Sequence, residues 1–137
     1  MKTILIAFDD SEPSRRALAR AAELAKAFGA AVHVTSVARV LVGSGHSMGP
    51  YDPTDMPSEH TEQLERAREL LAAQGIEVNL DPAEGDPADA IVELAEKVGA
   101  DLIVVGAHDR SLIERAVRPS VGGAVTRKTH RDVLIVH

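Results

Sequence analysis

The sequence has 137 residues, of which 45% are hydrophobic and 26% charged, as expected for an ordinary globular domain. Its formal net charge of −6 disfavours general binding to nucleic acid or to anionic membranes, and aromatic residues make up only 2% of the chain. Because the chain has no cysteine, disulfides, thiolate metal sites and a cysteine nucleophile are excluded.

Short β-rich runs alternate with segments of helical periodicity. The predicted strands, in chain order, are Lys2–Phe8, Ala31–Val37, Ile76–Leu80, Asp101–Gly106 and Val133–Val136. The first three predicted helices follow N-caps at Asp10 or Ser11, at Ser58 and at Asp86, and they end near Gly29, Gly75 and Gly99. The last predicted helix is Ser120–Lys128. This alternation predicts a single domain over residues 1–137, an α/β/α sandwich around a five-stranded parallel sheet.

Two predicted strand ends carry unusual polar residues. Ala7–Ser11 ends and follows the first strand, and Val105–Arg110 ends and follows the fourth. Ligands of open α/β sheets bind outside the carboxyl ends of the strands, at the point where the strand order reverses. The sequence therefore predicts a ligand site where these two segments meet.

Three separated segments, ILIAFDDSEPSRRAL, ADLIVVGAH and VLIVH, resemble a universal stress protein in order and spacing. The similarity covers essentially the whole chain and includes the long loop after the second strand, Ala38–Pro57. It implies the strand order 3-2-1-4-5 of the adenine-nucleotide alpha-hydrolase-like fold. It also implies a nucleotide cleft that Asp9 approaches and in which the backbone at Val37 contacts adenine.

One branch of this family binds ATP through the motif G-x-x-G, nine residues, then G-[S/T], in which glycines let backbone N–H groups approach phosphate. On this chain the motif begins at Gly106 and ends at Ser120, but Asp109 and Pro119 replace its second and third glycines. Asp109 would repel phosphate, and Pro119 has no N–H to donate. The candidate nucleotide-binding residues are Asp9, Val37, Gly106, His108, Ser120 and Val121. For His108 two interpretations stay open: it donates to a phosphate or acts in proton transfer, or it is a loop histidine that faces water.

Two interpretations of the altered motif stay open. In the first, the chain is a non-enzymatic stress-response regulatory dimer with weak or no ATP binding, because of Asp109 and Pro119. In the second, Arg110, Arg115 and Arg118 compensate, and the chain is an ATP or adenine-nucleotide sensor with Mg²⁺ beside ATP and slow hydrolysis. The adenine and ribose half of the cleft is less altered, so a nucleoside, AMP or a cyclic nucleotide fits where ATP does not.

Catalytic and metal sites find little support in the sequence. No serine stands in a nucleophile elbow and no histidine–acid pair is assignable, so we assign no catalytic residue. The pair Asp9-Asp10 is typical of response-regulator receivers, but no lysine follows the last strand. Four further candidate metal ligands match no compact motif and are interpreted as a solvated loop: His46, Asp52, Asp55 and His60.

The strand Val133–Val136 is expected at a sheet edge, where unpaired backbone groups invite a second chain. The family similarly dimerises through its last strands, so we predict a homodimer through this strand, with a regulatory protein as a further partner. We expect no nucleic-acid partner. The first apolar run is too short for a signal peptide and no run could span a bilayer, so we expect a cytoplasmic protein without membrane insertion.

Overall fold

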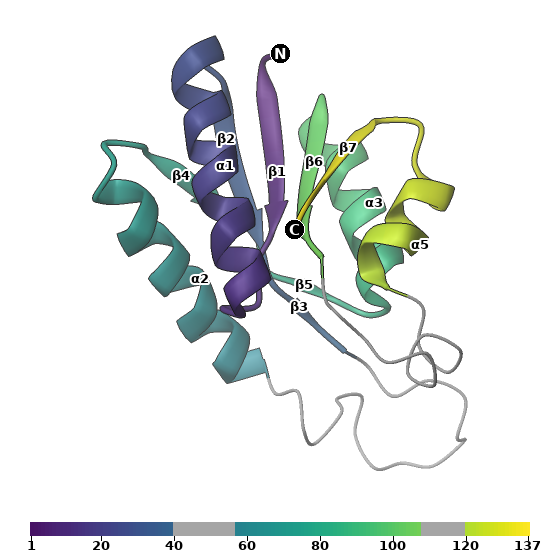
Figure 1. The fold of residues 1–137 in the computed structure, drawn as a ribbon. Helices are drawn as coiled ribbons and strands as arrows, with labels where there is room; N and C mark the ends of the chain where they lie inside the picture. The colour runs from purple at the N-terminus through teal and green to yellow at the C-terminus, as the bar shows by residue number, and fades with distance from the viewer. Residues whose placement is uncertain (40–56, 108–119) are drawn as a thin grey trace, which may run out of the picture.

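The computed structural model describes residues 1–39, 57–107 and 120–137. Its elements, in chain order, are β1 (Thr3–Ala7), α1 (Glu12–Phe28), β2 (Ala31–Thr35), β3 (Val37–Ala38), α2 (Pro57–Ala72), β4 (Val78–Leu80), β5 (Ala83–Glu84), α3 (Pro87–Val98), β6 (Leu102–Gly106), α5 (Val121–Lys128) and β7 (Asp132–Val136). Figure 1 shows helices on both sides of the main sheet, which confirms the predicted α/β class. No helix in the described ranges is long and apolar enough to cross a membrane.

The main sheet has five strands in the order β4-β2-β1-β6-β7, and every neighbouring pair is parallel. Counted along the predicted strands, this is the expected order 3-2-1-4-5. The two shortest strands, β3 and β5, stand outside that count because they pair with each other in a separate two-stranded sheet. The strand order therefore reverses at β1, whose neighbours β2 and β6 lie on opposite sides of it.

Several predicted boundaries were wrong by a few residues. The predicted second strand Ala31–Val37 is split, because the chain leaves β1 after Thr35 and pairs with β5 from Val37 onward. The third strand is shorter than predicted and spans only Val78–Leu80, the residues that pair with β2. Helix α2 begins at Pro57, so Ser58 lies inside the helix and its predicted role as the N-cap was wrong.

The predicted caps of α1 and α3 are confirmed. Ser11 caps α1 by accepting a hydrogen bond from the Ser14 N–H, and Asp86 caps α3 by accepting one from Asp89. Gly29 and Gly99 end these two helices in the left-handed conformation, with φ of 63° and 69°. Ser120 lies just before α5 as its cap, and not inside the helix as the range Ser120–Lys128 implied.

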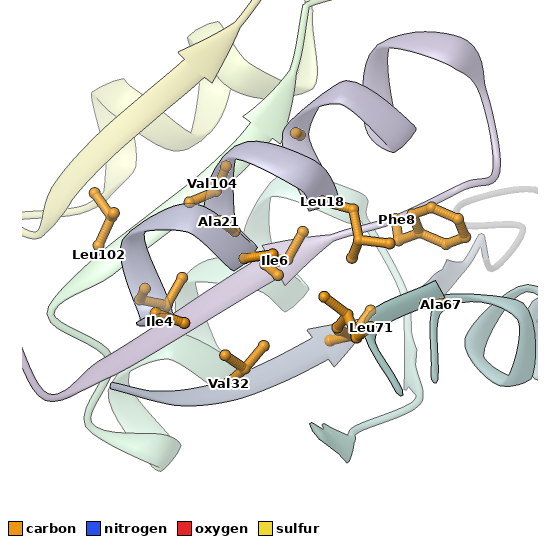
Figure 2. Packing of buried hydrophobic residues seen from close by; sticks show 14 of the residues in the cluster. Ile4, Ile6, Phe8, Leu18, Ala21, Val32, Ala67, Leu71, Leu102 and Val104 are labelled. Carbon is orange, nitrogen blue, oxygen red and sulfur yellow. The ribbon is translucent and has the colours of Figure 1, made fainter. Parts of the chain in front are cut away.

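The core consists of two apolar layers on either side of the sheet. Ile4, Leu5 and Ile6 of β1 are fully buried, because helices cover the central strand on both faces. One layer packs β1, β2 and β6 against α1 and α2, and Figure 2 shows it with Ile4, Ile6 and Val104 facing Leu18 and Ala21. The other layer packs the opposite face of the same sheet against α3 and α5.

Helix α1 packs closely against β6 at Gly106, the last residue of that strand. A methyl group on Gly106 would lie 2.5 Å from the carbonyl carbon of Pro13 and 2.7 Å from the backbone nitrogen of Ser14. Cβ atoms are essentially never found so close to backbone atoms, so only glycine fits this position. The first turn of α1 is thereby held against the end of β6.

The opposite end of the sheet is tied by Asp101, which lies just before β6. Its Oδ2 accepts hydrogen bonds from the N–H groups of Lys2 (2.7 Å) and Thr3 (2.9 Å). These two bonds are the main reason that the pKa of Asp101 is lowered from its ordinary value of 3.8. The carboxylate therefore joins the starts of β1 and β6 while it is ionised.

We expect Gly106→Ala to destabilise the fold by about 2–3 kcal/mol, because the added methyl group must displace backbone atoms of α1. Gly75→Ala is the matched control. Gly75 has φ of 76°, and a methyl group there would meet only open space. The substitution therefore carries only the cost of a left-handed backbone, about 1 kcal/mol. Urea unfolding of both variants measures the difference. Equal losses would show that α1 does not constrain Gly106.

We expect Asp101→Asn to remove stabilisation that depends on pH. Because folding lowers the pKa of Asp101 below 3.8, the ionised group stabilises the fold above about pH 4, and this contribution is lost as pH falls through the lowered pKa. The variant is therefore less stable than the wild type at pH 7, and the two stability curves converge in acid. Chemical unfolding between pH 7 and about pH 3 tests this; curves that stay parallel would contradict it.

Candidate functional site

A pocket of about 170 Å³ lies at the carboxyl ends of β1 and β6, where the strand order reverses. This is the place predicted from the sequence. Its walls combine apolar side chains with a small number of polar groups, which is the usual composition of a small-molecule site. The lining residues are Ala7, Phe8, Asp9, Ser14, Thr35, Ser36, Val37, Arg39, His60, Pro87, Ile91, Val105, Gly106 and Val121.

The apolar wall comes from the face of the sheet that α3 and α5 cover. Ala7 and Val105 are the last positions of β1 and β6 on that face, and Ile91 packs against them from α3. Val121, the first residue of α5, completes this side. This side of the pocket therefore offers an apolar surface to a flat ring system.

The turn after β1 supplies the acidic side of the pocket. Asp9 Oδ1 accepts hydrogen bonds from the N–H and hydroxyl of Ser11, at 3.0 and 2.5 Å. The next residue, Asp10, is the only described non-glycine residue with a positive φ, 61°. Its carboxylate is paired with Arg15 of α1 and Arg66 of α2, which holds the left-handed turn in place.

Asp10 is thus fully engaged by two arginines, which argues against a metal-binding Asp9-Asp10 pair. In the described residues no group of three or more histidine, cysteine or acidic side chains is placed to hold a metal ion. Of the predicted loop ligands, His46, Asp52 and Asp55 lie outside the described residues.

The backbone of Val37 presents a donor and an acceptor on the pocket side of β3. The carbonyl groups of Ser36 and Ala38 accept hydrogen bonds from Ala83 and Gly85, at 3.3 and 2.9 Å, so they face β5. Peptide groups alternate in direction along a strand, so the N–H and C=O of Val37 face away from β5. Val37 lines the pocket, and backbone N–H and C=O groups are among the polar groups that orient a ligand in a small-molecule site.

The structure brings together four of the six predicted site residues: Asp9, Val37, Gly106 and Val121 all line the pocket. Gly106, however, lacks a side chain because α1 packs against it, a reason independent of any ligand. His108 lies outside the described residues, as do Asp109 and Pro119.

Ser120, the remaining predicted site residue, caps α5 and does not line the pocket. Its hydroxyl accepts a hydrogen bond from the N–H of Gly123 at 3.1 Å. A methyl group on Gly122 would lie 3.1 Å from Val105, so this glycine lets α5 pack closely on β6. The start of α5 therefore stands beside the pocket with the positive end of its helix dipole.

A buried hydrogen-bond network from α2 was missed in the sequence. The Ser36 hydroxyl donates to Gln63 Oε1 at 2.7 Å and contacts Nδ1 of His60. His60 is only 7% exposed and lines the pocket, so its interpretation as part of a solvated loop was wrong. Because 24 residues separate His60 from Ser36, no local sequence pattern predicts this contact.

Comparison with known proteins agrees with this geometry. The model of the universal stress protein family matches residues 1–137. The chain is 32% identical to the stress response protein NhaX of Bacillus subtilis, over 97% of this chain and 96% of the relative.

Two solved structures are similar to this chain along nearly its whole length. One, a universal stress protein in complex with cAMP, has a TM-score of 0.79 at 30% identity, covering 99% of this chain and 97% of that one. The other, the universal stress protein from Archaeoglobus fulgidus in complex with dAMP, has a TM-score of 0.76 at 27% identity, covering 100% and 98%. The chain thus belongs to the universal stress protein family.

Proposed function

We propose that this protein is a stress-response regulator that binds an adenine nucleotide with a small phosphate group, such as cAMP or AMP, and acts through binding and not through catalysis. The observation that carries the proposal is the apolar pocket at the reversal of strand order, with Asp9 on one side and the Val37 backbone on the other. Two similar structures hold cAMP and dAMP, which supports the same ligand class.

The residues present fit an adenine nucleoside. The base would lie against Ala7, Ile91 and Val105, with its polar edge toward the Val37 backbone. The carboxylate of Asp9 would accept a hydrogen bond from a ribose hydroxyl, a charge-assisted bond stronger than a neutral one. The nucleotide phosphate would lie toward the start of α5, whose N–H groups and dipole favour an anion.

The sequence of the phosphate motif argues against tight ATP binding. Asp109 adds a negative charge to the motif and Pro119 removes an N–H donor. A triphosphate therefore loses more binding free energy than a monophosphate does. In the alternative, Arg110, Arg115 and Arg118 compensate, and ATP with Mg²⁺ binds as it does in a nucleotide sensor.

We expect calorimetric titration of the nucleotide-free protein to show binding of cAMP and AMP, with ATP at least about tenfold weaker whether or not Mg²⁺ is present, because the altered motif offers fewer phosphate donors.

Asp9→Asn should weaken cAMP binding about tenfold, the value of one charge-assisted hydrogen bond.

Glu77→Gln is the matched control, since this exposed acid lies just before β4, at the opposite end of the sheet. It should leave cAMP affinity unchanged. Tight ATP binding that requires Mg²⁺ would favour the sensor alternative. No binding of any adenine nucleotide would contradict the proposal.

We also propose a homodimer through β7, the last strand of the described sheet. Ala107 donates to the carbonyl of Val136 at 2.8 Å, so the peptide groups of Val136 and of every second residue before it face β6. Val133 and Ile135 therefore direct their N–H and C=O groups to the outer edge, where a second copy can pair.

We expect Val133→Pro to convert a dimer into a monomer, because proline removes one outward N–H and leaves the bonds to β6 intact. Val133→Ala keeps that N–H and should remain dimeric. Sedimentation velocity measures both, with circular dichroism as the check on folding. A folded Val133→Pro variant that stays dimeric would place the interface elsewhere.

A further inference from the structure

The hydroxyl of Thr35 is a buried polar group without a partner. Thr35 is 0% exposed, and its Oγ1 has no hydrogen-bond partner in the part of the chain that the structure describes. The other buried hydroxyls differ: Ser14 donates to the carbonyl of Ser11 at 3.0 Å, and Ser36 donates to Gln63. Native proteins rarely leave such a group unsatisfied, so an orphan of this kind needs an explanation.

The strand pattern shows where the Thr35 side chain points. Val32 and Val34 of β2 pack in the layer under α1 and α2, so Thr35, one residue later, points to the opposite face. It pairs with Ala7 of β1, which belongs to the layer under α3. Ala7 and Ile91 of that layer line the pocket together with Thr35. The Thr35 side chain therefore lies on the face of the sheet that forms the apolar side of the pocket.

A polar group at this position carries a cost that valine, of the same shape and better suited to a buried strand, would avoid. The cost is offset if a ligand supplies the missing hydrogen bond. The surrounding wall of Ala7, Ile91 and Val105 suits a flat apolar ring, and Val37 presents its backbone two residues further along the chain. A heteroaromatic base has flat apolar faces that suit this wall and polar atoms at its edge that can hydrogen-bond the hydroxyl and the backbone.

We propose that Thr35 Oγ1 hydrogen-bonds the base of the bound nucleotide and is a specificity-determining group of the pocket. This inference rests on the adenine-nucleotide binding proposed above. The hydroxyl can donate to a ring nitrogen or accept from an exocyclic amine. It acts with the Val37 backbone, so that one stretch of chain, Thr35–Val37, reads the base while Asp9 binds the sugar.

Calorimetric titration of cAMP into the wild type, Thr35→Val and Thr35→Ser tests the inference. Thr35→Val keeps the shape and removes the hydroxyl, so we expect affinity to fall roughly three- to tenfold, the value of one neutral hydrogen bond. Thr35→Ser keeps the hydroxyl and should stay within about twofold of the wild type. Without ligand, Thr35→Val should melt at the same temperature as the wild type or up to about 5 °C higher, because an unsatisfied group has been removed.

The outcomes separate this inference from the proposed function. If the wild type binds cAMP and Thr35→Val binds it equally well, the role of Thr35 is overturned while nucleotide binding stands. If ligand-free Thr35→Val melts several degrees lower, the hydroxyl has a partner within the protein, and the inference is overturned as well. If the wild type binds no adenine nucleotide, the proposed function and this inference both fail.

Discussion

The close packing of α1 against Gly106 is the constraint on which the site depends. Backbone atoms of Pro13 and Ser14 occupy the space that any side chain at Gly106 would need. This contact brings the turn after β1 to the end of β6, the two places where the sheet reverses its order. The pocket exists because these two strand ends are held together, and Figure 1 shows β1 and β6 side by side at the centre of the fold.

The described half of the site is held rigidly from several directions. Asp10 links the turn after β1 to both α1 and α2 through Arg15 and Arg66. Ser36 and His60 join the end of β2 to α2 on the far side of the pocket. Fixed walls of this kind favour a ligand portion of defined shape, since little conformational entropy is lost on binding. In the proposed complex the base and sugar of the nucleotide fit that description, whereas the phosphate would lie toward the altered motif between Gly106 and Ser120.

The sequence predicted the features that depend on local patterns. The apolar run of β1 indicated a strand covered on both faces, and Ser11 and Asp86 indicated helix starts, all of which the structure confirms. The features it missed depend on contacts between distant residues. The pairing that splits β3 from β2, the burial of His60 and the unpartnered hydroxyl of Thr35 arise only once the chain has folded.

The most direct test of the site is a titration of isotope-labelled protein with cAMP, followed by amide chemical shifts in two-dimensional NMR. We predict the largest shift changes at the backbone amides of Asp9, Val37 and Gly106, with little change at Glu77 and Asp101 at the opposite end of the sheet. Changes confined to other surfaces, or no change at millimolar cAMP, would contradict an adenine-nucleotide site at the reversal of strand order.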